Sequence, residues 1–278
     1  MLSQREIMER ASQLSSLPPS CLRLAALAAQ DAPDLKEIEE IMTLDPILTA
    51  RVLRLANSVM FAPSRRIGSV RDAVVRTGTQ ALLGVLVGHS TGPLMKKHLP
   101  SLGYSSETLW GHSVATAIAT KAIEDRRPQF SSVFSFTSGL LHDIGKLVLE
   151  PLMTPARVSA FDKAITEGGK AGYEAEYDIL AMNHAEVSGV IIQLWLLPEI
   201  IAKAVTLHHY PGANVDPIIL VVYMANVAAN QIGDRPLTPT ELEIFNAIRT
   251  QVGITPGEFV RICQMTAERL DQVGPLYG

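Results

Sequence analysis

The chain has 278 residues and a formal net charge of −4, with 47% hydrophobic and 19% charged residues. This length can bury one large core or two smaller ones, and this composition is typical of a globular protein and excludes a disordered one. No long run of Lys and Arg is present, so binding to nucleic acid, which needs concentrated positive charge, is not predicted.

Cysteines and hydrophobic runs indicate the compartment. Cys21 and Cys263 are far apart and form no metal-type pair, so we expect a reducing environment and no disulfide scaffold. The first ten residues carry charges where a signal peptide would be apolar. The longest apolar runs, such as residues 218–223, are far shorter than the roughly 20 residues that span a bilayer. The sequence therefore predicts a cytoplasmic protein with no membrane partner.

Helix start signals recur along the whole chain. Asp34 with Glu37, and Asn183 with Glu186, have the spacing of a capping box. A capping residue before a proline marks further starts at Asp45-Pro46, Asp216-Pro217, Thr238-Pro239 and Thr255-Pro256.

Between these starts, apolar residues fall at helical spacing, as in the stripe Val187, Val190, Ile191, Leu194 and Trp195. The same spacing predicts an apolar helix over about residues 132–151. No convincing alternating strand and no Asn-Gly hairpin is found, so the predicted fold class is all-α.

The helical spacing is interrupted near residues 95–107. Five of the seven histidines follow residue 105. We expect an N-terminal helical subdomain at residues 1–104 and a histidine-bearing bundle at residues 105–235. Helices at residues 236–278 would pack on the bundle or form a homodimer contact, and the sequence favours neither.

A polar group lies inside the apolar helix predicted over residues 132–151. Residues 139–146 read Gly-Leu-Leu-His-Asp-Ile-Gly-Lys, so His142 and Asp143 fall within an apolar run. A buried imidazole and a buried carboxylate need partners, because an unpaired buried charge is very costly. Lys146 follows at helical spacing, so the three side chains share one side of the helix.

Other polar residues are also predicted to face inward: His112, His184, His208, His209 and Asn226. Inward-facing histidines and an aspartate on separate helices suit Fe, Mn, Ni or Zn, with the carboxylate compensating charge. Two-metal hydrolytic sites use such sets. For any one of these histidines, a core residue bonded to a carbonyl is a strong alternative.

The motif at residues 140–146, with His112 upstream and His184, His208 and His209 downstream, resembles the HD superfamily of metal-dependent phosphohydrolases. The spacing is most similar to its HD-GYP cyclic-di-GMP phosphodiesterase branch. Leu-Ser-Ser-Leu-Pro at residues 14–18, Leu-Asp-Pro at 44–46 and Arg-Leu-Ala-Asn-Ser at 54–58 resemble a specific relative, the HDOD signalling domain. The resemblance covers about residues 7–235.

The resemblance implies a bacterial regulatory protein whose N-terminal helical subdomain packs on an HD-like bundle. Its matched positions imply a set of metal ligands: His112, His142, Asp143, His184, His208, His209 and, at the place of a closing aspartate, Asn226. In an active relative, Lys146 would contact a substrate phosphate.

Three departures from the family pattern bear on activity. Asn226 can offer an amide oxygen but no charge. The expected acid before His112 aligns with Thr108, with Glu107 one place off. Residues 210–213, Tyr-Pro-Gly-Ala, replace a Gly-Tyr-Pro loop. Asp143 is left as the main anionic ligand, so two divalent cations would be poorly neutralised.

Three functions follow as hypotheses. The first is an HDOD-type signalling protein with protein partners and a whole or partial site for one or two divalent ions, with little or no hydrolysis. The second is a metal-dependent phosphodiesterase or phosphohydrolase for a nucleotide-like ligand, with Asp143 and Lys146 as catalytic residues. The third is a metal-free helical interaction module.

Overall fold

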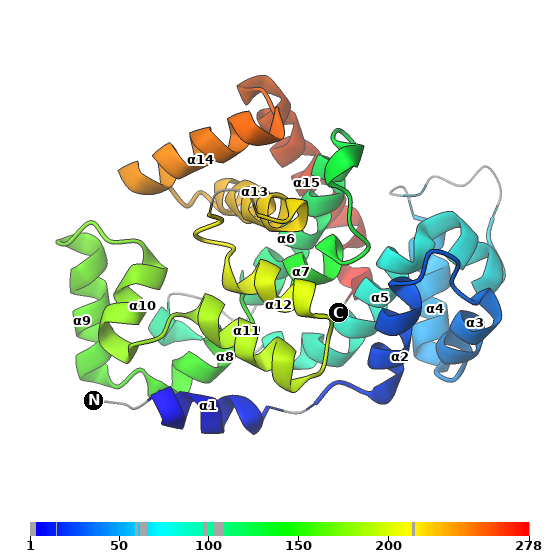
Figure 1. Ribbon diagram of the computed structural model, residues 1–278, viewed down its shortest axis with the longest axis horizontal. Helices are drawn as coiled ribbons and strands as arrows, with labels where there is room; N and C mark the ends of the chain where they lie inside the picture. Colours follow the sequence, from blue (N-terminus) through cyan, green and yellow to red (C-terminus); the bar gives the residue numbers. More distant parts are fainter. Residues whose placement is uncertain are drawn as a thin grey trace.

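The computed structural model describes residues 4–14, 16–58, 61, 66–96, 99–102, 108–212 and 215–277. The regular elements of these residues are all helices, with no β-strand among them (Figure 1). The predicted all-α fold class is therefore confirmed. None of the helices in this part of the chain is long and apolar enough to cross a membrane.

Five helices come first along the chain: α1 Gln4–Ser12, α2 Pro19–Ala28, α3 Leu35–Thr43, α4 Pro46–Ala56 and α5 Val70–Met95. Two of the predicted caps begin α3 and α4. Asp34 Oδ1 accepts from the backbone N–H of Lys36 at 2.8 Å, and Asp45 Oδ1 accepts from that of Ile47 at 2.8 Å. Helices α2–α4 pack against α5, whereas α1 packs against α8 and α11 (Figure 1).

Helix α5 is kinked at Gly78, whose φ of +75° is a conformation that favours glycine. The second part of α5 packs against α7. A methyl group on Gly84 would lie 2.4 Å from the Phe136 ring, so this contact requires glycine.

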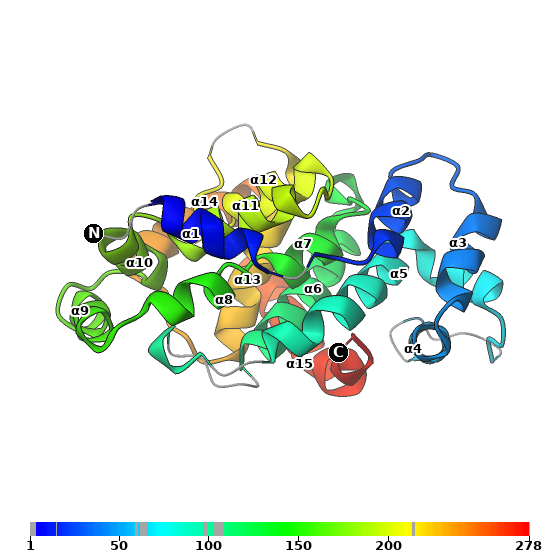
Figure 2. The same cartoon turned by 90° about the horizontal axis from the view of Figure 1, so that it is seen from below.

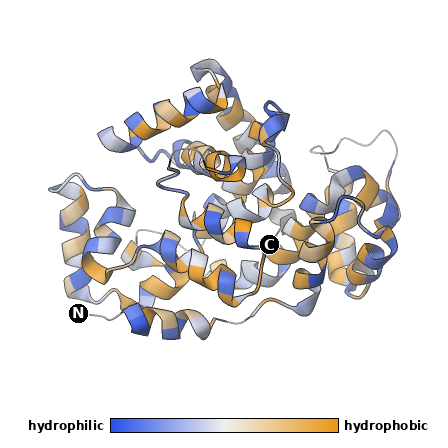
Figure 3. Ribbon diagram, in the orientation of Figure 1, coloured by the Kyte–Doolittle hydropathy of each residue, from blue (hydrophilic) through white to orange (hydrophobic). Residues whose placement is uncertain are grey.

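The centre of the molecule is built from α6 Thr108–Glu124, α7 Ser135–Leu141 and α13 Pro217–Ile232, which contact one another. Small residues bring α6 and α7 together, because a methyl group on Gly139 would lie 3.0 Å from the Ala117 Cα. Coloured by hydropathy, α13 is mostly hydrophobic, whereas the peripheral α14 alternates (Figure 3).

Around this centre lie α8 Lys146–Leu149, α11 His184–Leu194 and α12 Glu199–Thr206. Helices α9 Pro155–Thr166 and α10 Gly172–Leu180 form a hairpin at the end of the molecule opposite α2–α4 (Figures 1 and 2). Helices α14 Pro239–Val252 and α15 Pro256–Tyr277 close the chain, and α15 packs on α6, α13 and α5. In the part of the chain that the structure describes, three short 3₁₀ helices complete the elements: η1 Pro100–Leu102, η2 Pro128–Phe130 and η3 Glu150–Leu152.

The capping boxes at Asn183 with Glu186 and at Thr238 with Glu241 are present with both reciprocal bonds. Thr255 and Glu258 pair in the same way before α15. Asp216 differs, because its side chain makes no capping bond to α13.

The single helix predicted over about residues 132–151 is wrong. Helix α7 ends at Leu141 and α8 begins at Lys146, with a tight turn between them. In this turn the backbone N–H of Ile144 donates to Leu141, three residues back, instead of four. The N–H of Gly145 leaves the helical pattern and donates to Ser188 Oγ on α11 at 2.9 Å.

Candidate metal centre

Two histidines follow the ends of helices and are oriented by backbone carbonyls. His142 Nδ1 lies 2.7 Å from the Gly139 carbonyl at the end of α7, and His208 Nδ1 lies 2.6 Å from the Val205 carbonyl at the end of α12. A carbonyl only accepts, so each Nδ1 donates its hydrogen. Each Nε2 therefore keeps a lone pair, which is the form that binds a metal.

A third histidine is oriented by a carboxylate. His184 is the first residue of α11, and its Nδ1 lies 2.5 Å from Glu176 Oε2 on α10. The same oxygen accepts the backbone N–H of His184 at 2.8 Å. Both side chains are buried, so Glu176 fixes the ring of His184 and directs its Nε2 inward.

The carboxylate of Asp143 lies between the imidazoles and is almost fully buried. Its Oδ1 is 3.0 Å from His184 Nε2 and 3.7 Å from His208 Nε2. Its Oδ2 is 3.4 Å from His142 Nε2 and 3.6 Å from His112 Nε2. One carboxylate thus faces two groups of histidines, one through each oxygen.

The first group consists of His112, His142 and Asp143, whose ligand atoms lie within 4.8 Å of one another. The Nε2 atoms of His112 and His142 are 3.2 Å apart. Asn226 Oδ1 on α13 lies 3.0 Å from His112 Nε2, so the amide reaches this group as its inward position predicted.

The second group consists of His184, His208 and His209, with ligand atoms again within 4.8 Å. The Nε2 atoms of His184 and His209 are 2.9 Å apart. The ring of His209 stacks on that of Tyr173, with centroids 4.1 Å apart.

Lys146 adds a cation to the first group. Its Nζ lies 2.5 Å from Asp143 Oδ2. Both side chains are nearly inaccessible to solvent. The expected sharing of one side by His142, Asp143 and Lys146 is therefore present, even though a turn replaces the helix there.

The ionisation of the site suits a metal. Burial lowers the pKa of His112 to about 3 and also lowers the pKa of His142, His208 and His209. Burial would raise the pKa of Asp143, but His142 and Lys146 outweigh it and hold this pKa well below 3.8. At neutral pH the site therefore holds four neutral imidazoles and an ionised carboxylate.

The donor atoms fit a divalent transition metal. His208 Nε2 is buried and makes no hydrogen bond to any residue that the structure describes. Asp143 Oδ1 is close to His184 Nε2 but outside hydrogen-bonding geometry. In the pairs His112–His142 and His184–His209, two ring nitrogens face each other, and a proton or a cation between them is needed. Imidazole nitrogens with a carboxylate oxygen form a donor set for Fe, Mn, Ni or Zn.

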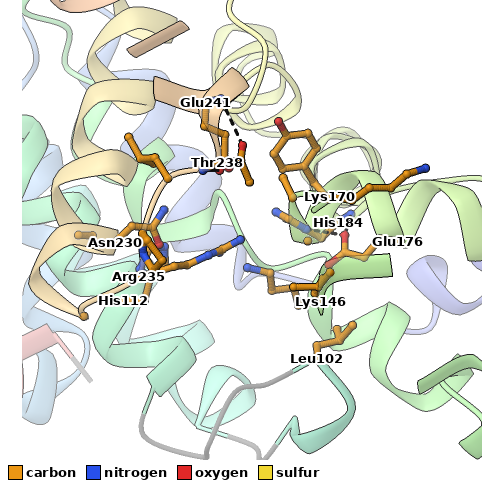
Figure 4. A pocket seen from close by; sticks show the side chains of 18 of the residues that line it. Leu102, His112, Lys146, Lys170, Glu176, His184, Asn230, Arg235, Thr238 and Glu241 are labelled. Atoms are coloured by element: carbon orange, nitrogen blue, oxygen red, sulfur yellow. Dashed lines mark hydrogen bonds and ion pairs between the residues drawn. The ribbon is translucent and has the colours of Figure 1, made fainter. Parts of the chain in front are cut away.

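A cavity of about 1000 Å³ opens onto this cluster, and His112, His184 and Lys146 line its floor. Arg235, which follows the end of α13, and Lys146 point toward one another across the cavity (Figure 4). Part of the wall is apolar, from Val158, Phe161, Ile165 and Leu237. The cavity therefore offers positive charge beside the cluster and an apolar surface farther out.

All seven residues named from the sequence as metal ligands lie together in this cluster. Glu176 and Arg235 were missed, as was the Tyr173 ring against His209. Glu107 and Ala213, which the sequence comparison with the family singled out, lie outside the described residues, as does the side chain of Thr108.

The family is decided by a match of the HDOD domain model to residues 14–211, more than half of the chain. The chain belongs to the HDOD domain family. The matched range includes the five clustered histidines and Asp143, whereas Asn226 and Arg235 follow it.

Three solved structures are similar over nearly the whole HDOD chain. A "putative phosphohydrolase" from Shewanella amazonensis SB2B has a TM-score of 0.72, 23% identity and 98% coverage of each chain. An HDOD domain protein with unknown function from Geobacter sulfurreducens has a TM-score of 0.71, 22% identity and coverage of 99% and 98%. A "putative signal transduction protein" from Marinobacter aquaeolei VT8 has a TM-score of 0.69, 18% identity and coverage of 96% of this chain and 60% of that one. At these identities the likeness shows the fold.

An uncharacterized protein of Treponema pallidum (strain Nichols) is 22% identical over 250 residues, 88% of this chain. The chain spans about half the length of this curated relative, because the match covers 48% of it.

Proposed function

We propose that this HDOD protein is a regulatory component of signal transduction whose histidine cluster binds one or two divalent metal ions and hydrolyses little or nothing. The observation that carries this proposal is the convergence of four imidazoles on one buried carboxylate, Asp143, with a fifth, His209, beside His184. The ligands would be His112, His142, Asp143, His184, His208, His209 and Asn226.

Low activity follows from the charge of this ligand set. Two-metal hydrolysis needs anionic ligands that neutralise both ions. Here a neutral amide, Asn226 Oδ1, takes the place beside His112, and the ammonium of Lys146 lies against Asp143 Oδ2. The site is therefore better suited to holding metal, as a sensor or a structural element, than to turnover.

The remaining parts of the proposal concern partners and organisation. Residues 1–104 would form a subdomain for protein contacts, and residues 105–235 the metal-bearing bundle, in a cytoplasmic protein with signalling proteins as partners. The signal-transduction name of the Marinobacter protein supports such partners. Residues 236–278 would serve packing, since α15 contacts α6 and α13.

A second candidate, a phosphohydrolase or phosphodiesterase acting on a nucleotide-like substrate, is favoured by the cavity beside the cluster. Lys146 and Arg235 could bind phosphate oxygens there, and the apolar wall around Phe161 could bind the rest of the substrate. A bound divalent ion would supply Lewis-acid assistance. The name of the Shewanella protein is in line with this candidate.

Elemental analysis of the purified protein and a hydrolysis assay separate these functions. We expect bound Fe, Mn, Ni or Zn, and no release of product from cyclic dinucleotides or chromogenic phosphodiesters with added Mn²⁺ or Fe²⁺. Activity that disappears in both His142→Ala and Asp143→Ala would establish the enzyme instead. A protein that binds no metal under any loading condition would support the metal-free interaction module.

A further inference from the structure

The two halves of the histidine cluster differ in charge. On the side of His184, the buried Glu176 carboxylate lies 2.5 Å from Nδ1 and adds a negative charge directly behind a ligand. Carboxylates in this position make the imidazole a stronger donor. On the side of His112, the polar group nearest to the metal-facing Nε2 atom on α13 is the uncharged Asn226 Oδ1, at 3.0 Å.

The side of His184 also has its donor atoms directed inward. The lone pair of His208 Nε2 is buried, and its Nδ1 is held by the Val205 carbonyl. The Nε2 atoms of His184 and His209 lie 2.9 Å apart, and Asp143 Oδ1 is 3.0 Å from the former. Three imidazoles and one carboxylate oxygen therefore converge there, which is a sufficient set for one transition-metal ion.

On the side of His112, a cation is already in place. The ammonium of Lys146 lies 2.5 Å from Asp143 Oδ2, the carboxylate oxygen that faces His112 and His142. A metal ion bound through this oxygen would stand against a buried positive charge, and the repulsion would be strong in a medium of low dielectric constant.

The charge balance of the cluster favours one ion. Asp143 and Glu176 contribute two negative charges, and Lys146 contributes one positive charge. One divalent ion would leave the cluster with a net charge near +1, whereas two ions would leave it near +3. Buried charge of that size is strongly disfavoured.

We propose that the cluster takes a single divalent ion, bound by His184, His208, His209 and Asp143 Oδ1, and that the ammonium of Lys146 takes the place of a second ion beside Asp143 Oδ2. Lys146 is then the residue that determines metal stoichiometry. This inference rests on the proposed metal-binding function and specifies it.

Mn²⁺ titration of the full chain, followed by elemental analysis and electron paramagnetic resonance, tests the proposal. The wild-type protein should bind one Mn²⁺ per chain, with the spectrum of an isolated ion. Lys146→Met, which keeps most of the side-chain length without its charge, should bind two ions with a spectrum altered by coupling between them. Lys146→Arg keeps the charge and should stay at one.

The position of the ion is tested with a second pair of variants. His209→Ala should weaken binding of the first ion at least tenfold, whereas His112→Ala should leave one ion bound with little change. Anomalous scattering from a crystal of the Mn²⁺-loaded wild-type protein should place the ion beside His208, and this measurement decides the question even if a variant fails to fold.

Each outcome is distinguishable from failure of the proposed function. Two ions in the wild-type protein, one ion beside His112, or an unchanged stoichiometry in a folded Lys146→Met variant would overturn the inference and leave metal binding intact. Absence of metal in the wild-type protein and in every folded variant would overturn both.

Discussion

Glu176 on α10 and His184 on α11 are joined twice through one oxygen. Glu176 Oε2 lies 2.5 Å from His184 Nδ1 and accepts the backbone N–H of the same histidine at 2.8 Å. The carboxylate therefore sets both the ring orientation and the start of the helix that carries the ring. Burial would lower the pKa of His184, but Glu176 outweighs it and raises this pKa.

Glu176→Gln should weaken metal binding by about 10- to 100-fold, because the amide keeps the shape of the side chain but removes the charge behind the ligand. The measurement is a competition titration against a chelator of known affinity. Asp178→Asn is the matched control: it lies on the same helix, pairs with Lys170 at the surface and should bind metal as the wild-type protein does. Equal affinities in both variants would contradict the role given to Glu176.

Asn226→Asp should tighten metal binding roughly tenfold, because it adds a negative charge to the same buried cluster, 3.0 Å from His112 Nε2, and this charge offsets that of a divalent ion bound on the His184 side. Asn246→Asp, at an exposed position on α14, serves as a control for a general change in charge. If Asn226→Asp binds no more tightly than the wild-type protein, the residue does not act on the ion.

Stability of the metal-free protein should fall as the pH is lowered from about 7 to 5. Unfolded histidines take up a proton near pH 6.5, whereas the buried imidazoles have lowered pKa values and resist protonation until lower pH. The neutral buried imidazoles therefore stabilise the fold fully above pH 6.5. As the pH falls below 6.5, the free energy of unfolding decreases by about 1.4 kcal/mol per pH unit for each proton that the unfolded chain binds and the folded chain does not. The residues are His112, His142, His208 and His209.

His184 acts in the opposite direction, because its raised pKa gives stability that is present below pH 6.5 and lost as the pH rises through the folded value. Because the four histidines with lowered pKa values outweigh the one with a raised pKa, the free energy of unfolding should still decrease as the pH is lowered. Urea midpoints measured in chelator at several pH values test it, and His208→Leu should flatten the slope. A midpoint that does not change, or that rises toward pH 5, would show that the imidazoles are not neutral in the fold.

Gly145→Ala should destabilise the protein by about 1–3 kcal/mol and weaken metal binding. A methyl group at this position would lie 2.2 Å from the His184 carbonyl oxygen and 2.8 Å from the Ser188 backbone nitrogen, so α11 must move. Gly111→Ala is the control: it lies within α6 with open space around it, and alanine should stabilise the helix by up to about 1 kcal/mol. Thermal unfolding of both variants provides the comparison.

The fold class was predictable because its signals are local. Asp34, Asp45 and Thr238 cap helices through bonds to residues two or three positions away, and such bonds can be inferred from spacing alone. The gathering of the histidines was predictable for a related reason, since each lies on an apolar stripe. The turn at residues 142–145 was not predictable from spacing, because its Gly145 N–H bonds to Ser188 Oγ, 43 residues along the chain, and not within the helix.

Glu176 could have been found from the sequence. Tyr173, Glu176 and Leu180 fall at i, i+3 and i+7 on one face of α10, and all three are buried. A carboxylate on an otherwise apolar stripe indicates a buried partner. Arg235 gave no such signal, because it follows the end of α13, where spacing no longer fixes direction.

His142 and His208 each bind a carbonyl three residues back, in the last turn of the helix that precedes them. The last carbonyls of a helix need partners from outside its own ladder, and here imidazoles supply two of them. The same hydrogen bond therefore satisfies a carbonyl at the end of each helix and fixes the tautomer of the histidine ring that follows it. Lengthening α7 or α12 by a turn would rotate the histidine ring away from Asp143 and would also change which ring nitrogen carries the proton. Helix length in this family member is therefore under chemical as well as steric constraint.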